Sequence, residues 1–445
     1  MKTLVRFVSF FLLFTPNLFG QSPFLWEQQK DFSGGPDLLR SVSTVGNMAI
    51  TAGNASVTGG LDLGVLNYGG AGAVRWSDQV PLTTGISTGV FTATLGNFGF
   101  VAGYNSVVPN DSDIFVRAYN TRTGNVLWRD TLNKGRDDFP QGLAAGPFVV
   151  VVVGQGGNTS VAPITALDAL IRAYDPLTGR VLWEDQVNKG DTIVDIAWAV
   201  AIDFDQVFVA GSSGIGENRK MIVRAYHART GTLQWEVERA GVSPTAITTR
   251  SGRVFVAGST NDLHAFITGL NTTNGGFVWE DTSTPGIFVD VEIRDHRVVG
   301  VGRSLQGSLI RAYHPADGRV AWQHITTPPG DVSESLSAVA LSDEVAYVTG
   351  VSGEDLGESE FVVRAYDLLR GRVLFDDRSH RSGGLFGSAG FDIAIGATHV
   401  YAVGRASDSG SSDFLIRAYD RTAVEPKLRL LIFILGRIFG LNALL

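Results

Sequence analysis

One short motif repeats along almost the whole sequence. In residues 173–183 an Ala-Tyr-Asp triplet is followed by Pro-Leu-Thr-Gly and then by Arg-Val-Leu-Trp. The same spacing of Ala, Gly and an aromatic residue recurs in seven copies, at intervals of 43 residues (279 to 322) to 55 residues (128 to 183). Such a period is the signature of a repeat architecture rather than of independent domains. The aromatic residues of the seven copies are Trp76, Trp128, Trp183, Trp235, Trp279, Trp322 and Phe375.

Two copies of this motif depart from the pattern. The copy that ends at Trp279 has Gly269 in place of Ala. The copy that ends at Trp76 begins with Leu66 and keeps only the Gly and the Trp.

A second marker is a β-rich run that ends in glycine, and it occurs eight times. Four short strands fit into each repeat unit, because every apolar run is too short for a helix, is rich in β-branched and aromatic residues and is bounded by turn residues. Four strands per unit at this period predict an all-β, eight-bladed β-propeller of four-stranded blades. The glycines of the second marker are Gly53, Gly103, Gly154, Gly211, Gly258, Gly302, Gly350 and Gly404.

The mismatch between eight glycine runs and seven aromatic motifs predicts how the ring closes. The last unit ends with Arg417–Asp420 and continues without the Gly and Trp of the motif, whereas Trp26-Glu27 near the N-terminus resembles Trp183-Glu184. Pairing these two segments satisfies two exposed strand edges. We therefore predict that Trp26 lies beside Ala418, and that it is the eighth blade-docking aromatic residue.

The two ends of the chain lie outside the repeats. Residues 1–20 have a basic start and a short apolar run, which is typical of a signal peptide; a membrane anchor would need about 20 apolar residues. Residues 21–425 are the predicted propeller. Residues 426–445 form an apolar tail interrupted by Arg429 and Arg437. We interpret the tail as an amphipathic helix on the propeller or on a membrane surface, or as a misread end of the gene.

The composition narrows the classes of function. The chain has no cysteine, which excludes disulfides, thiolate metal sites and c-type haem attachment. Its net charge of −8 argues against nucleic-acid binding, which needs a basic footprint. We expect an exported monomer, periplasmic or extracellular, whose stability comes from its core.

The motif Ala-x-Asp-x-x-Thr-Gly-x-x-x-Trp resembles the tryptophan-docking motif of the quinoprotein (PQQ-type) propeller superfamily. The resemblance covers residues 22–420. It implies that each aromatic ring packs onto the neighbouring blade. The superfamily includes quinone-dependent alcohol dehydrogenases and also non-enzymatic scaffolds, such as a propeller lipoprotein of the bacterial outer-membrane assembly machine. The resemblance therefore specifies a fold and leaves the activity open.

The enzymes of that superfamily hold a quinone over a calcium ion in the centre of the ring. Four acidic residues fall on the expected inner strands: Asp195, Asp290, Glu292 and Asp392. A calcium site would need several of them to converge. We favour the alternative, in which each acid sits at the start of an inner strand and binds backbone at the rim. Accordingly we assign no catalytic residue and no metal ligand, leave cofactor-binding residues unknown, and predict no cofactor, with PQQ and Ca as the alternative.

A recurrent arginine precedes the Ala of the motif. The turn places this arginine opposite the docking aromatic residue or opposite the next residue, which is acidic in Glu184, Glu236 and Asp376. We interpret the arginines as structural cross-strand partners; the alternative is a ring of cations for an anionic ligand. They are Arg117, Arg172, Arg224, Arg311, Arg364 and Arg417.

These observations favour a non-catalytic exported propeller that presents rim loops to a protein or glycan partner. The alternatives are a PQQ- or Ca-dependent oxidoreductase and a purely structural component of the cell envelope. The glycine-rich run Gly211–Gly216 is interpreted as a hairpin turn, because no helix follows it. Loops on a rigid scaffold are the usual place for recognition. The loops that vary most are Asn105–Asp113, Gln155–Thr165, Ser212–Lys220 and Ser352–Ser359.

Overall fold

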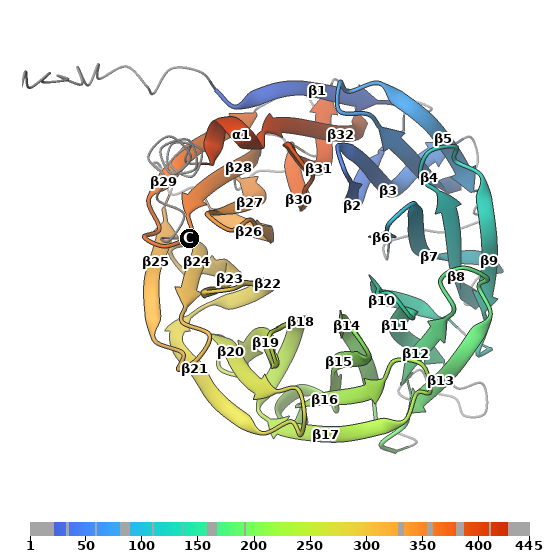
Figure 1. Cartoon of the computed structure of the whole chain (residues 1–445), viewed down its shortest axis with the longest axis vertical. Coiled ribbons are helices and arrows are strands. Elements are labelled where there is room, and N and C mark those ends of the chain that lie inside the picture. The colour runs from blue at the N-terminus through green and yellow to red at the C-terminus, as the bar shows by residue number, and fades with distance from the viewer. Residues whose placement is uncertain are drawn as a thin grey trace, which may run out of the picture.

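The computed structural model shows eight four-stranded antiparallel sheets arranged as blades around a central channel (Figure 1). This confirms the all-β, eight-bladed propeller. The predicted signal peptide and the C-terminal tail lie outside the residues that the structure describes, as does residue 21. The described residues are 22–32, 35–57, 60–80, 90–108, 111–135, 137–157, 167–190, 193–327, 333–353, 359–379, 387–408 and 411–425.

Each blade runs from an inner strand at the channel to an outer strand at the circumference. Blade 1 comprises β2 (Leu38–Val45), β3 (Met48–Val57), β4 (Gly60–Tyr68) and β5 (Val74–Val80), and blade 2 comprises β6 (Phe91–Leu95), β7 (Phe98–Val108), β8 (Asp111–Asn120) and β9 (Val126–Leu132). Blade 3 comprises β10 (Phe139–Ala145), β11 (Val150–Gly157), β12 (Leu167–Tyr174) and β13 (Val181–Val187), and blade 4 comprises β14 (Asp195–Asp203), β15 (Gln206–Ser213), β16 (Lys220–His227) and β17 (Leu233–Ala240).

Blade 5 comprises β18 (Val242–Arg250), β19 (Arg253–Thr260), β20 (His264–Asn271) and β21 (Phe277–Pro285), and blade 6 comprises β22 (Ile287–Arg294), β23 (Arg297–Ser304), β24 (Gly307–Tyr313) and β25 (Val320–Thr326). Blade 7 comprises β26 (Glu334–Leu341), β27 (Val345–Ser352), β28 (Glu360–Asp367) and β29 (Val373–Ser379), and blade 8 comprises β30 (Ala389–Ile395), β31 (His399–Asp408), β32 (Ser411–Asp420) and β1 (Phe24–Lys30).

Helix is confined to two short elements in the described part of the chain. A 3-10 turn, η1 (Gly216–Asn218), lies in the hairpin between β15 and β16, which confirms the hairpin reading of the glycine-rich run. The helix α1 (Arg421–Val424) follows β32, and Asp420 caps its N-terminus. Neither has the length and apolarity needed to cross a membrane.

The N-terminal strand closes the ring. β1 pairs antiparallel with β32 as the outer strand of blade 8, and Trp26 lies opposite Ala418 (Figure 1). The predicted closure is therefore confirmed. Blade 8 is built from both ends of the repeat region, so its outer strand joins the first and last parts of the chain.

The hydrophobic core lies between the blades. The second strand of each blade is buried on both faces, as in β15, where every residue from Val207 to Ser213 is buried. Strands covered on both faces read as continuous apolar runs rather than as alternating ones. One core cluster combines Val151 and Ile171 of blade 3 with Val207 and Val209 of blade 4. Burial between blades thus stabilises the ring as a whole.

The docking aromatic residues lie at the junctions between blades. The indole N–H of Trp183 donates to the carbonyl oxygen of Ala228 in the next blade, at 2.7 Å. Its ring covers Gly231, where an added Cβ would come within 2.6 Å of it, and it stacks on Tyr226 at 5.3 Å. The other six tryptophans of the motif donate the same bond to Gly70, Thr121, Pro176, Thr272, Pro315 and Leu368.

The phenylalanine of the set lies at the junction with blade 8. Phe375 stacks on Tyr419 at 5.5 Å. The equivalent carbonyl of blade 8 belongs to Arg421, and it accepts the backbone N–H of Glu425 at the end of α1. A side chain without an N–H donor suits this junction, because blade 8 continues there into α1 instead of into a docking turn.

One detail of the predicted motif is wrong. In the first copy Asn67, and not Leu66, lies opposite Trp76, in the place that Ala118 takes opposite Trp128. The reason is that the turn after Tyr68 is one residue shorter than in the other copies. A pattern with fixed spacing therefore places the first copy one residue too early.

The glycine of the docking turn allows a direct test of aromatic docking. Gly231 and Gly252 both have φ values in the left-handed region, +70° and +77°, but only Gly231 faces a ring. We expect Gly252→Ala to lower the free energy of unfolding by about 1 kcal/mol through backbone strain alone. Gly231→Ala should lower it by about 2 kcal/mol more, because the new methyl group displaces the indole. Chemical denaturation measures both, and equal losses would contradict the docking role.

Candidate functional site

The register between the third and fourth strands places the recurrent arginine. In blade 3 Ala173 lies opposite Trp183, so Arg172 lies opposite Glu184. The same offset puts Arg224 opposite Glu236. The sequence left two positions open opposite the arginine, the aromatic residue and the residue after it. The structure places the arginine opposite the residue after the aromatic one.

Each arginine also reaches back to the preceding blade. Arg224 binds Glu236 of its own blade at 2.5 Å and Asp185 of the preceding blade at 2.9 Å. The hydroxyl of Tyr226 donates to the same Asp185 carboxylate at 2.8 Å. Burial alone would raise the pKa of Glu236, but hydrogen bonds from Lys189 and Arg224 outweigh it and lower that pKa. The arginine therefore links two blades beneath the docking tryptophan.

The acid that receives this arginine lies two residues after the aromatic residue, and it was missing from the sequence interpretation. It contacts the next blade's arginine at 2.9–3.0 Å at all five junctions where it occurs. The signal was present in the sequence as a repeated aromatic-x-Asp triplet. The five residues are Asp78, Asp130, Asp185, Asp281 and Asp377.

Junctions that lack the arginine also lack this acid. Val237 takes the place of the acid after Trp235, and the next blade has Thr268 in place of Arg. Gln28 takes that place after Trp26, and the next blade has Leu66. A buried charge without its partner would be costly, so both members are absent together.

At the junction between blades 6 and 7 the arginine pairs with acids of its own blade. His324 stands at the position of the acid after Trp322, and Arg364 instead binds Glu334 at 3.0 Å and Asp376 at 2.9 Å. Arg364 and Glu334 are each only 2% exposed. Glu334 begins β26 of the same blade, so both ion pairs of Arg364 lie within blade 7, and Arg364 reaches blade 6 through a hydrogen bond to the Thr326 hydroxyl at 3.3 Å.

The acids on the inner strands fall into two groups. Asp195 begins β14, as predicted, and accepts the backbone N–H of Lys189 at 2.7 Å. Asp290 and Asp392 lie in the middle of β22 and β30, which corrects the prediction that they start a strand. Both sit at the β-bulge of the inner strand, where one extra residue turns a side chain toward the neighbouring blade.

The bulge acids bind backbone across a blade junction. Asp290 accepts the N–H of Val291 through one oxygen and that of Val339 in blade 7 through the other. Asp392 likewise accepts N–H groups of Ile393 and of Val42 in blade 1. In each carboxylate one oxygen binds the acid's own strand and the other binds the inner strand of the neighbouring blade, so both oxygens are used.

Glu292 lies two residues after Asp290 in the same strand. Burial raises the pKa of Glu292 to about 8, and the charge of Asp290 adds to the shift while Arg294 opposes it. Burial also raises the pKa of Asp392 to about 6, although its backbone hydrogen bonds lower it in part. Glu292 lines a pocket of about 460 Å³ at the channel mouth, together with Thr44, Arg294 and Arg421.

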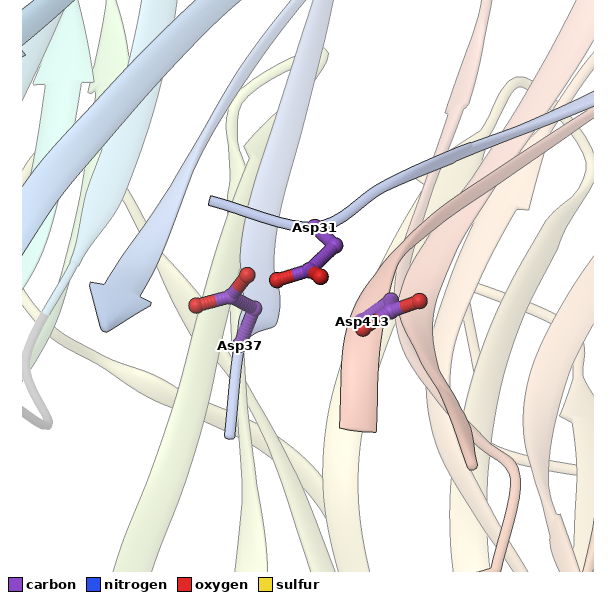
Figure 2. A group of neighbouring side chains, drawn as sticks. All are labelled: Asp31, Asp37 and Asp413. Carbon is purple, nitrogen blue, oxygen red and sulfur yellow. The ribbon is translucent and has the colours of Figure 1, made fainter. Parts of the chain in front are cut away.

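Acidic side chains gather more closely at the ring closure than in the channel. Asp31 follows β1, Asp37 precedes β2 and Asp413 lies in β32, and one carboxylate oxygen of each lies within 4.8 Å of the other two (Figure 2). Among the described residues this is the single group of three or more acidic or histidine side chains with that spacing. Burial and the two neighbouring aspartates raise the pKa of Asp37 to about 6, against hydrogen bonds from Ser56 and Phe32.

The loops predicted to bind a partner connect the second strand of a blade to its third strand. They therefore lie on one face of the ring. The loop Ser212–Lys220 borders a pocket of about 720 Å³ that is also lined by Lys189 and Glu238. Ile215 at its edge is 56% exposed. The loops Asn105–Asp113, Gln155–Thr165 and Ser352–Ser359 lie partly outside the described residues.

A family model supports the relationship that the docking motif suggests. The model described as outer membrane protein assembly factor BamB matches residues 25–218 and 219–384, which is most of the chain. The chain belongs to this BamB-like family of PQQ-type propellers. A search of curated protein sequences gave no significant match.

Solved structures share the fold of this BamB-like propeller at low sequence identity. BamB from Moraxella catarrhalis is 13% identical, with a TM-score of 0.51 over 88% of this chain and 100% of that one. Quinohemoprotein alcohol dehydrogenase from Comamonas testosteroni is 10% identical, with a TM-score of 0.56 over 89% and 76%. Sqt1 from Chaetomium thermophilum, bound to a ribosomal protein segment, is 12% identical, with a TM-score of 0.59 over 90% and 100%. These likenesses show the fold alone.

The cross-blade arginine yields a prediction on stability. We expect Arg224→Ala to lower the melting temperature, because it removes bonds to both Asp185 and Glu236. In a double-mutant cycle, Arg224→Ala and Asp185→Ala should couple by about 1 kcal/mol, the size expected for a partly exposed pair. Urea denaturation of the four proteins measures the coupling. Unchanged stability with loss of binding to an anion would instead support a ligand-binding role for the arginines.

The half-buried Glu292 yields a prediction on pH dependence. Its folded-state pKa of about 8 lies above the ordinary value of 4.5, so the folded protein holds a proton that the unfolded chain releases. The bound proton stabilises the folded protein fully below pH 4.5, and this stabilisation is lost as the pH rises through 8. We expect Glu292→Gln to stabilise the protein at pH 8.5 and to leave its stability at pH 4.5 unchanged, as measured by urea denaturation. Glu217→Gln, at an exposed acid, is the control; an equal effect at both pH values would contradict the assignment.

Proposed function

We propose that this protein is a non-catalytic, exported propeller scaffold that presents its rim loops to a protein partner, with a glycan as the alternative ligand. The observation that carries the proposal is the use of the channel acids. Asp290 and Asp392 each engage both carboxylate oxygens with backbone N–H groups of two strands. A quinone enzyme needs such acids to be directed at a metal and a substrate.

The rim pocket supports a binding role. Ile215 and Lys220 combine an exposed apolar side chain with a positive charge beside a concave surface, on a protein whose net charge is −8. Concave surfaces with a few polar groups on a rigid scaffold are favourable binding sites. Family membership is consistent with export to the periplasm, and the apolar N-terminal run of residues 7–14 agrees with it.

The partner can be sought by affinity capture with matched variants. We expect the protein without residues 1–20, used as bait on extract of its own organism, to retain a defined partner. Ile215→Asp with Lys220→Glu should abolish that retention. Leu177→Asp with Arg180→Glu makes the same chemical change at an exposed turn on the opposite face and should leave it intact. Equal binding by both variants would contradict the rim site.

The enzymatic alternative has its own test. After reconstitution with calcium and the quinone, we expect neither stoichiometric quinone binding nor dye reduction with a panel of alcohols and sugars. Quinone binding with turnover would overturn the scaffold proposal and would favour the oxidoreductase.

A further inference from the structure

The extra residue at the bulge of the inner strand differs from blade to blade. A bulge leaves this residue without a partner on the second strand. It is Arg40 in β2 of blade 1 and Phe391 in β30 of blade 8, and both strands border the channel (Figure 1). Among the bulges of the described strands, Arg40 is the one charged residue in this position. The extra residues of the other bulges are Gln141, Trp198, Thr245, Val289 and Ser337.

Two arginines of adjacent blades flank the ring of Phe391. The guanidinium of Arg40 lies 5.1 Å from the centroid of this ring, and the guanidinium of Arg405 in β31 lies 5.9 Å from it. All three side chains are half-buried. An aromatic ring attracts a cation but carries no net charge, so it does not neutralise the two arginines.

Arg40 differs from the recurrent arginines in its lack of an acidic partner. Arg224, for example, binds two carboxylates, whereas no carboxylate of the described residues is among the groups that act on Arg40. The Nε of Arg40 is buried and has no hydrogen-bond partner in the same part of the chain. Burial lowers the pKa of Arg40, and burial and the charge of Arg40 lower the pKa of Arg405. A half-buried cation beside a like charge is costly unless an anion joins it.

Aromatic rings continue this surface into the next two blades. Tyr104 of β7 acts on the charge of Arg40, and its ring contacts that of Phe139 in β10 edge-on at 4.8 Å. Arg40 and Phe391 are each the third residue of an inner strand, and these strands begin on the face that carries the rim loops. An arginine–aromatic belt therefore borders the channel on that face. It consists of Arg405, Phe391, Arg40, Tyr104 and Phe139.

We propose that the arginine–aromatic belt binds the carboxylate side chains of an acidic peptide segment of a protein partner, with Arg40 and Arg405 as the binding cations. The inference rests on the proposed scaffold function and assigns the chemistry of the partner. A planar guanidinium offers paired N–H donors that match the two oxygens of a carboxylate. Arginine and aromatic residues are also the types that concentrate at the centres of protein interfaces, which favours a peptide over an acidic glycan.

The test uses the purified protein and a hexaglutamate peptide that is blocked at both ends and labelled with fluorescein. Fluorescence anisotropy should show saturable binding of this peptide and no binding of hexaglutamine. Arg40→Met keeps the length of the side chain and removes its charge. We expect it to weaken the binding of hexaglutamate by at least about tenfold, as for the loss of a charge-assisted hydrogen bond.

Arg303→Met is the matched control. Arg303 lies opposite the first residue of β22, as Arg405 lies opposite the first residue of β30, and it is exposed. Its replacement should leave the affinity for hexaglutamate unchanged. Arg40→Met should keep or raise the melting temperature, because it removes a cation that repels Arg405. A lower melting temperature with unchanged peptide binding would make Arg40 a structural residue and would overturn the proposal.

Three further outcomes would overturn the proposal. The first is that hexaglutamate does not bind, and the second is that it binds the parent protein and Arg40→Met equally. The third is that an oligogalacturonate binds in an Arg40-dependent manner while hexaglutamate does not, which would identify an acidic glycan as the ligand. The capture experiment tests the scaffold function separately. A partner that the parent protein and Arg40→Met retain equally would overturn the present inference and leave the scaffold proposal standing.

Discussion

The contact on which the ring depends is the packing of one aromatic side chain against the glycine of the next blade's turn. A propeller blade is a small twisted sheet that cannot bury its own faces, so its stability comes from its neighbours. The indole of Trp183 fills the space above Gly231, bonds to the carbonyl of Ala228 and stacks on Tyr226. One side chain thus fixes distance, height and rotation between two blades. The arginine and aspartate contacts lie directly beneath it and follow the same geometry.

Much of this could be predicted from the sequence, because the determining contacts repeat. The blade number, the pairing of Trp26 with Ala418 and, to within one residue, the cross-strand position of the arginines follow from residues that recur at a fixed spacing. The first copy was misplaced by one residue because its turn is shorter, a change that fixed spacing cannot register. The acid at Asp185 and its equivalents was visible as a repeated triplet, but its partner lies in the next blade, about 40 residues away.

The side chains at the channel could not be assigned from the sequence. Asp290 lies at a β-bulge, and whether its carboxylate faces the channel or a neighbouring strand depends on one extra residue in that strand. Arg40 meets Phe391 because the first and the last blade are neighbours in the closed ring, and no local pattern reveals which bulge residues then lie together.

The central claim is that the N-terminal strand is an integral part of blade 8 and closes the ring. Hydrogen–deuterium exchange of the native protein, read by mass spectrometry, tests it most directly. The account predicts that the backbone amides of β1 paired with β32 are protected to the same degree as those in the outer strands of the other blades, and that β1 and β32 lose protection together as denaturant is added. Rapid exchange of β1 while β32 and the other blades stay protected would contradict it.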